Sequence, residues 1–287
     1  MGADVGLQEF VRMTPGLGGM VLSAVGYHQH GMRPAVHRGL PSPYLTLIFS
    51  LDGPVTGGLT PEQSDGFATD IVIGGLQDGP AYVHQPDRQT GVQLAVHPLA
   101  ARALFGLPAA ALSGQVVVPD GRDVLGRAGG EVQEQLREKA SWEDRFDILR
   151  GYFRRRAAAA RQGTVRPEVA EAWTWLARHH GSGTVPGLAA HVALSERRLT
   201  ALFRAETGVT PKQAARLMRF ERAKAQVVRA VVADAPPDLA RVAADCGYYD
   251  HSHLVRDFRQ YTGVSPTAWL AEECRNIQAG GHMNGPE

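Results

Sequence analysis

The chain has 287 residues, with 30 Lys and Arg against 29 Asp and Glu, so its formal net charge is +1. A nearly neutral total excludes a generally polybasic nucleic-acid coat and an acidic disordered protein. Hydrophobic residues make up 44% of the sequence and charged residues 21%, which is an ordinary globular composition. The length suits about two domains of roughly 100–200 residues each.

The sequence favours a cytoplasmic protein. No run of about 18 apolar residues occurs, so we expect no membrane-spanning segment. The first residues lack the basic and apolar regions of a secretory signal. Two cysteines, Cys246 and Cys274, are too few for a disulfide framework, which favours a reducing compartment.

Charge divides unevenly along the chain. Residues 1–164 contain 15 basic and 16 acidic side chains, whereas residues 165–275 contain 15 basic and 12 acidic ones. The C-terminal part is therefore the better candidate for binding nucleic acid.

The N-terminal part, residues 1–125, is predicted to be a β-rich domain. Short runs rich in β-branched or aromatic residues, separated by Gly and Pro, predict strands at 21–27, 44–51, 71–73 and 91–97. A helix is expected over 98–105, ending at Gly106.

A helical segment and a linker, residues 126–164, follow this domain. One helix is expected over 131–139, and Ser141 is expected to cap a second. Trp142, Phe146, Leu149 and Phe153 fall on one face of that second helix. This apolar stripe either packs on the β-rich domain or forms a helix pair in a dimer. Residues 161–164 are expected to link the domains.

An internal repeat is the strongest signal in the sequence. The nine residues 203–211 recur at 258–266 with six identities, an offset of 55. The match extends back to Ser195 and Asp250 and, with a one-residue gap, to 188–189 and 242–243. Each copy predicts a short helix, a turn and a longer helix that begins after Ser195 or Asp250 and ends at Gly208 or Gly263. This is the helix-turn-helix plan, whose second helix enters the DNA major groove.

The outward faces of the two longer helices carry side chains suited to DNA. If the apolar positions of the first face the core, its outward face is Arg197, Thr200, Ala201 and Arg204. The corresponding face of the second is Ser252, Val255, Arg256 and Arg259, with His251 near the helix start. Arginine can contact guanine, hydroxyl groups can donate or accept hydrogen bonds, and valine can meet a thymine methyl group.

Residues 170–272 resemble the DNA-binding domain of the AraC/XylS family of bacterial transcription regulators. The resemblance rests on the repeated Phe-Arg and Thr-Gly-Val motifs and on the stretch 242–266, the most specific part. It implies two helix-turn-helix units, joined by a long helix over about 212–232, that read successive major-groove segments. The residues implied as readers are Arg197, Thr200, Arg204, His251, Ser252 and Arg256. Those implied as phosphate contacts are Ser195, Lys212 and Arg259, and Arg198, Asp250 and Val255 complete the expected DNA-binding set.

Two features depart from the family pattern. Ala214 stands where the family often has an aromatic residue. The spacer 230–238, with Pro236 and Pro237, is longer than usual and could alter the angle between the two units.

Residues 1–160 also resemble, more weakly, the N-terminal regions of actinobacterial regulators of this family, through 37–48 and 96–108. The resemblance implies a sensor or dimerisation module, with a cupin-like β domain that binds a small effector as the family precedent. The expected fold class is therefore α+β, with a β-rich N-terminal domain and an all-α DNA-binding domain over 165–275. Residues 276–287 are expected to be a disordered tail.

Other chemistry finds little support in the sequence. His28, His30 and His37 could suggest a cupin metal site, but no acidic residue lies between Glu9 and Asp52, so we expect no metal. His84 and His97 are interpreted as structural, and Cys246 as a small apolar side chain. No phosphate-binding loop, zinc spacing or nucleophile elbow occurs. We expect no cofactor and no enzymatic activity.

The function predicted is a sequence-specific transcription regulator modulated by a small molecule or partner at the N-terminal domain. The alternative is a constitutive DNA-binding protein whose N-terminal domain only dimerises. An alkyl-transfer enzyme fused to a DNA-binding module is disfavoured, because residues 1–245 contain no cysteine. Expected partners are double-stranded DNA, a small effector, RNA polymerase and a second copy of the chain, in the cytoplasm at the nucleoid.

Overall fold

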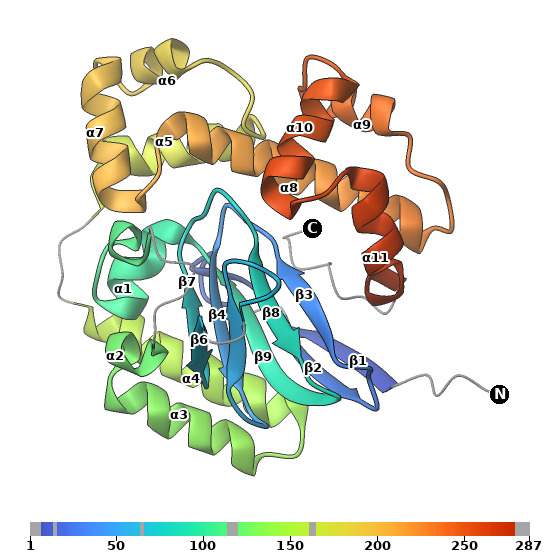
Figure 1. The fold of residues 1–287 in the computed structure, drawn as a ribbon. Helices are drawn as coiled ribbons and strands as arrows, with labels where there is room; N and C mark the ends of the chain where they lie inside the picture. Colours follow the sequence, from blue (N-terminus) through green and yellow to red (C-terminus); the bar gives the residue numbers. More distant parts are fainter. Residues whose placement is uncertain (1–6, 14–15, 64–65, 114–119, 161–164, 279–287) are drawn as a thin grey trace.

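A computed structural model describes residues 7–13, 16–63, 66–113, 120–160 and 165–278. An N-terminal domain of two antiparallel sheets, flanked by helices, lies against a C-terminal domain made of helices (Figure 1). The expected α+β fold class is confirmed. Within the described residues, every helix falls short of the length or apolarity that crossing a bilayer needs.

The nine described strands form two sheets. The first sheet has, in spatial order, β1 (Leu7–Met13), β2 (Val21–His30), β9 (Arg88–Val96), β4 (Leu45–Ser50) and β7 (Ile71–Gly74). The second has β3 (Ala35–Gly39), β8 (Ala81–Gln85), β5 (Val55–Gly58) and β6 (Phe67–Thr69). Every described strand pairing is antiparallel. Strands β2 to β5 alternate between the two sheets, and so do β6 to β9, while the hairpin β5–β6 stays within the second sheet. This is the strand order of a jelly roll, the architecture of cupins.

The four predicted strands are all present, and β2 and β9 are longer than expected. The predicted helix over 98–105 is a 3-10 turn, η1 (Pro98–Ala100), followed by α1 (Ala101–Phe105). It ends at Gly106, whose φ of 81° is left-handed and favours glycine.

One face of the first sheet packs against helices. Leu45, Leu47 and Phe49 point from β4 into this core and are fully buried, because alternate residues of a strand share one face. Trp142 lies over Gly26 of β2, where a Cβ atom would collide with the indole. The covering elements are α1, η2 (Ala109–Leu112), α2 (Gly121–Leu125), α3 (Arg127–Glu138) and α4 (Trp142–Ala159).

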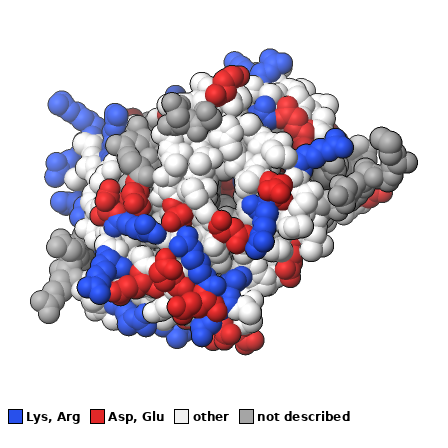
Figure 2. Space-filling view, turned by 60° about the horizontal axis from the view of Figure 1, so that its bottom comes forward, with Lys and Arg blue, Asp and Glu red and all other residues white. Residues whose placement is uncertain are grey.

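Helix α4 begins as expected, with the Ser141 hydroxyl accepting a hydrogen bond from the Asp144 amide at 3.1 Å. Its residues Phe146, Leu149 and Phe153 are buried in the core, so the apolar stripe packs inside the domain. The outer surface of α3 and α4 is instead a mixture of both charges (Figure 2), with ion pairs such as Arg127–Glu131. The stripe is therefore not available for a helix pair between two chains.

The C-terminal domain has seven helices in the described residues. They are α5 (Pro167–Arg178), α6 (Val185–His191), α7 (Glu196–Thr207), α8 (Pro211–Val232), α9 (Leu239–Asp245), α10 (His251–Thr262) and α11 (Pro266–Gln278). Helix α8 has 22 residues, about 33 Å at 1.5 Å per residue. It lies between the α6–α7 and α9–α10 pairs (Figure 1). The predicted linker 161–164 lies outside the described residues, and α11 continues past the predicted boundary at 275.

The first half of the C-terminal domain shares a core with the N-terminal domain. Trp173 of α5 stacks on Phe203 of α7, with ring centroids 5.8 Å apart, and contacts His97 from the β domain at 5.6 Å. At the edge of this core, Arg102 Nε donates to both carboxylate oxygens of Glu206, at 2.8 and 3.0 Å. Packing and this ion pair, whose hydrogen bond is bifurcated, thus fix α7 to the N-terminal domain.

The second half of the C-terminal domain contacts strand β3 of the N-terminal domain. His37 Nδ1 lies 3.3 Å from a carboxylate oxygen of Glu273, and Arg38 pairs with Glu272. Both glutamates belong to α11. The N-terminal domain therefore contacts both ends of the helical domain through different elements.

Stability should fall on acidification because of His97. Burial lowers the pKa of this imidazole to about 4 from its ordinary 6.5. Between these two values the unfolded chain binds more protons than the folded one, so the free energy of unfolding decreases as pH falls through that window. We expect a contribution of at most about 1.4 kcal/mol per pH unit.

Urea unfolding at pH 7 and at pH 5 measures this effect. His97→Asn keeps a side-chain acceptor for the Leu99 amide, which His97 Nδ1 caps at 3.2 Å, and should reduce the pH dependence. The exposed His30→Asn is the matched control. An unchanged pH dependence in His97→Asn would contradict the prediction.

Candidate nucleic-acid interface and ligand pocket

Helices α6 and α7 form the first predicted unit. The Thr184 hydroxyl accepts a hydrogen bond from the Gly187 amide at 3.1 Å, which caps α6. Ser195 caps α7 by accepting from the Arg198 amide at 3.3 Å, and α7 ends at Gly208 with a φ of 84°. Leu199 and Phe203 are fully buried, which fixes the face that α7 turns outward.

Helices α9 and α10 form the second unit by the same means. The Asp250 carboxylate accepts a hydrogen bond from the His253 amide at 2.7 Å and caps α10. The helix ends at Gly263, with a φ of 79°. Leu254 and Phe258 are fully buried at the positions equivalent to Leu199 and Phe203.

The turns of the two units differ by one residue. In the first turn the Leu194 amide donates to Ala189, and in the second the Tyr248 amide donates to Ala243, both at 3.0 Å. Ser195 directly follows Leu194, whereas Tyr249 stands between Tyr248 and the cap of α10. The repeat gap is therefore at Tyr249, which is 93% exposed. The sequence showed that a gap was needed but not that an exposed aromatic side chain fills it.

The outward face of α7 is organised as predicted. Arg197, Thr200 and Arg204 line one shallow hollow, together with Glu196, Ala201 and Ala205. In the described part of the chain, the side chains of Arg197 and Arg204 make no ion pair. Arg198, also predicted, is exposed beside this face. Unpaired, exposed guanidinium groups can approach base edges and phosphates.

The outward face of α10 presents a second such set. His251, Ser252, Arg256 and Arg259 are exposed, and Val255 is half-buried between them. Lys212 is exposed in the first turn of α8, between the two units along the chain. The structure thus places the predicted residues on helix faces, but their contacts with DNA remain a prediction.

Helix α10 is anchored to α8 by a charged contact. Arg216 donates to Asp257 at 2.8 Å and to Gln260 at 2.6 Å, and the Asp257 side chain is almost completely buried. Phe220 of α8 contacts both Phe258 and Tyr261 through their rings. These contacts fix the outward face of α10 relative to the connecting helix.

A family model described as a helix-turn-helix domain matches residues 188–272. This range contains both units and the helix that joins them. The C-terminal part of the chain is an AraC-type helix-turn-helix domain. The match confirms the helix-turn-helix domain that the repeat predicted and supports a DNA-binding role in transcription regulation.

Several solved structures are similar to the chain. ToxT from Vibrio cholerae O395 has 11% identity and a TM-score of 0.46, with 93% of this chain and 97% of that chain covered. The DNA-binding domain of AdpA, in complex with a target DNA, has 28% identity and a TM-score of 0.34, covering 39% and 96%. CuxR, an AraC-like transcriptional activator, has 16% identity and a TM-score of 0.32, covering 81% and 84%. No curated protein matches the sequence significantly.

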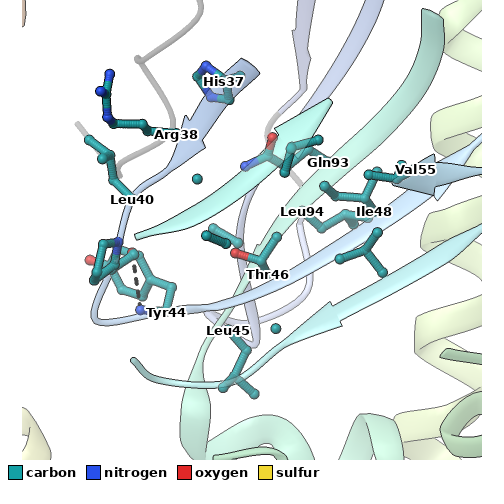
Figure 3. Close-up of a pocket in the computed structure, with 18 of the residues that line it drawn as sticks. His37, Arg38, Leu40, Tyr44, Leu45, Thr46, Ile48, Val55, Gln93 and Leu94 are labelled. Carbon is teal, nitrogen blue, oxygen red and sulfur yellow. Dashed lines mark hydrogen bonds between the residues drawn. The ribbon is translucent and has the colours of Figure 1, made fainter. Parts of the chain in front are cut away.

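A pocket of about 220 Å³ lies between the two sheets of the N-terminal domain, beside the AraC-type domain. Its walls come from both sheets and from α8, which contributes Glu221 and Lys224. Figure 3 shows Thr46 and Gln93 directed into the space between the strands. The sequence did not predict this pocket, because its polar residues alternate with apolar ones as on a solvent-exposed strand.

The histidines considered as a possible metal site have different partners. His28 Nδ1 lies 2.8 Å from the Thr90 hydroxyl, whereas His37 lines the pocket and pairs with Glu273. Among the described residues, no group of three or more His, Cys, Asp or Glu side chains could hold a metal ion.

His84, Cys246 and Ala214 have surroundings that indicate structural roles. His84 Nε2 lies 3.2 Å from the Gln63 carbonyl oxygen, so it is hydrogen-bonded as predicted. Cys246 is fully buried at the end of α9, and burial raises the pKa of its thiol. It packs as a small apolar side chain. Ala214, which departs from the family pattern, is also fully buried.

Proposed function

We propose that the protein reads two adjacent major-groove segments of a specific DNA site and that a small molecule in the N-terminal pocket modulates this binding. The observation that carries the first part is the pair of exposed arginine-bearing faces on equivalent helices, α7 and α10. A domain built only for packing would not need unpaired arginines on the outward faces of both copies.

The dimensions of the domain support two contacts on one face of DNA. Helix α8, about 33 Å long, separates the two units, and successive major-groove segments on one face lie about 34–36 Å apart. Arg197, Thr200 and Arg204 are proposed to read the first segment, and His251, Ser252 and Arg256 the second. Val255 supplies an apolar contact for a thymine methyl group.

The remaining predicted residues are assigned to positioning. Lys212 and Arg259 are proposed to contact phosphates, as is Arg198 beside the α7 face. Ser195 and Asp250 already accept the capping hydrogen bonds of α7 and α10. Their proposed role is to fix the starts of the reading helices near the DNA backbone. Tyr249, exposed directly before Asp250, adds an aromatic contact that the first unit lacks.

The pocket supports modulation rather than constitutive binding. Lys224 and Glu221 of α8 form part of its wall, and His37 and Arg38 line it while pairing with α11. A molecule in the pocket would therefore contact groups that hold the DNA-binding domain in place. RNA polymerase contact, self-association and location at the nucleoid stay predictions from the family resemblance.

Selection of bound fragments from a random DNA pool, using the full-length protein, tests the proposed reading. We expect one enriched motif with two conserved segments separated by about one helical turn. In a parallel selection, Tyr249→Ala should weaken base preference only at the edge of one segment. The control Leu59→Ala, at an exposed position of the N-terminal domain, should return the full motif. Enrichment of a single short segment, or of none, would contradict two-unit reading.

A further inference from the structure

We propose that the pocket binds a neutral molecule that offers hydrogen-bond donors and acceptors on an apolar frame. The inference rests on the proposed effector function and concerns the chemistry of that ligand. It is carried by the polar residues of the pocket wall and by the pairing of every charged group there.

Glutamine side chains dominate the polar wall. On β9, Val92 is fully buried and is not among the pocket-lining residues, whereas Gln89 and Gln93 both line the pocket. Gln29 of β2 is only 3% exposed and accepts a hydrogen bond from Gln89. Gln85 lines the pocket from β8 of the opposite sheet. A glutamine amide carries two N–H donors and one carbonyl acceptor without net charge, so this wall matches neutral polar groups.

Some polar groups of the pocket wall have no hydrogen-bond partner within the described residues. Within the described part of the chain, the side chains of Gln85 and Gln93 make no hydrogen bond. The Nε atom of Arg38 is buried and also has no described partner. Gln85 and Gln93 are half-buried, and Arg38 Nε is buried. A ligand with both donors and acceptors would satisfy all three groups, and for Arg38 Nε it would remove the free-energy cost of an unpaired buried donor.

The charged groups of the wall already have partners. Lys224 donates to Glu221 at 2.8 Å, and the two side chains are 9% and 14% exposed. Arg38 pairs with Glu272, and His37 lies 3.3 Å from Glu273. An ionised acid or amine would therefore enter without a free counter-charge and would lose its hydration. A neutral ligand avoids that cost.

Apolar side chains make up another part of the wall and suit a compact ring. Phe10, Ile48, Val55 and Phe67 line the pocket from both sheets. Apolar walls with a few placed polar groups are typical of small-molecule sites. A volume of about 220 Å³ accommodates a single substituted ring.

Three matched probes test the proposal on the full chain: benzamide, benzoate and benzylammonium. They share one ring and differ in charge and hydrogen bonding. Ligand-observed NMR titration gives their affinities. We expect benzamide to bind at least about tenfold more tightly than either ion, because only the ions lose charge hydration in the pocket.

Gln93→Leu should weaken benzamide binding at least about tenfold, and Gln93→Glu should instead favour benzylammonium. Gln135→Leu, an exposed position on α3, is the matched control, and circular dichroism checks folding of each variant. Tighter binding of benzoate would overturn the ligand class while leaving an effector pocket in place. No binding by any probe, or benzamide binding unaffected by Gln93→Leu, would overturn the proposal.

Discussion

Replacing Arg197 and Arg256 together by alanine is expected to weaken binding to the selected DNA site by about 2–6 kcal/mol, while the free energy of unfolding stays unchanged. Each arginine is exposed on the outward face of its helix and makes no ion pair in the described residues. A base-reading arginine contributes about 1–3 kcal/mol, and contacts in separate grooves should add. Fluorescence anisotropy with labelled DNA measures both single variants and the double variant.

The matched control is Arg154→Ala with Arg155→Ala. These arginines are exposed on α4 of the N-terminal domain, and their removal changes the net charge equally. The control should lower affinity only slightly, and equally for selected and random DNA. If the Arg197 and Arg256 variants lose equal affinity for both DNAs, the two arginines contact phosphates rather than bases.

Replacing Phe203 by alanine is expected to lower the free energy of unfolding by about 3–5 kcal/mol. Phe203 is fully buried in α7 and stacks on Trp173, which in turn contacts His97 of the N-terminal domain. Its removal leaves a cavity where α5, α7 and the N-terminal domain meet, and close-packed surroundings refill such a cavity only in part. Urea unfolding followed by tryptophan fluorescence measures the loss.

The same variant should also bind DNA more weakly, because Phe203 sets the outward face of α7. Leu59→Ala serves as the control, since Leu59 is 61% exposed and its truncation should change stability by about 0.5 kcal/mol or less. A loss below about 1 kcal/mol for Phe203→Ala would show that the junction does not depend on this ring.

The helical domain could be predicted from sequence because each of its signals is local. Ser195 and Asp250 mark helix starts, Gly208 and Gly263 mark helix ends, and a repeat shows every signal twice. The repeat also predicted which helix faces turn outward. When the equivalent Leu and Phe residues are buried, the opposite face of each helix must face solvent. Tyr249 was missed because a one-residue gap can be placed anywhere in a short turn.

The N-terminal domain was harder to predict, and its pocket could not be predicted. Strands β3, β5 and β8 are short and weakly patterned, so no local signal distinguishes them from loops. On β9 the alternation of Gln89 and Gln93 with Val92 and Leu94 indicates a strand with one face in solvent. That polar face becomes the wall of an internal pocket only because the second sheet packs over it, and this packing depends on tertiary structure. The pairing of His37 and Arg38 with α11 depends on tertiary contacts in the same way.

The contacts of β3 with α11 have a thermodynamic consequence. His37 and Arg38 belong to the pocket wall and also contact the second unit through α11. If a ligand occupies the pocket as proposed, ligand and DNA act on one shared conformational equilibrium. Linkage then requires that operator DNA change the affinity for ligand by the same factor by which ligand changes the affinity for operator. A molecule that fills the pocket equally well in the free and the DNA-bound protein would occupy it without regulating anything.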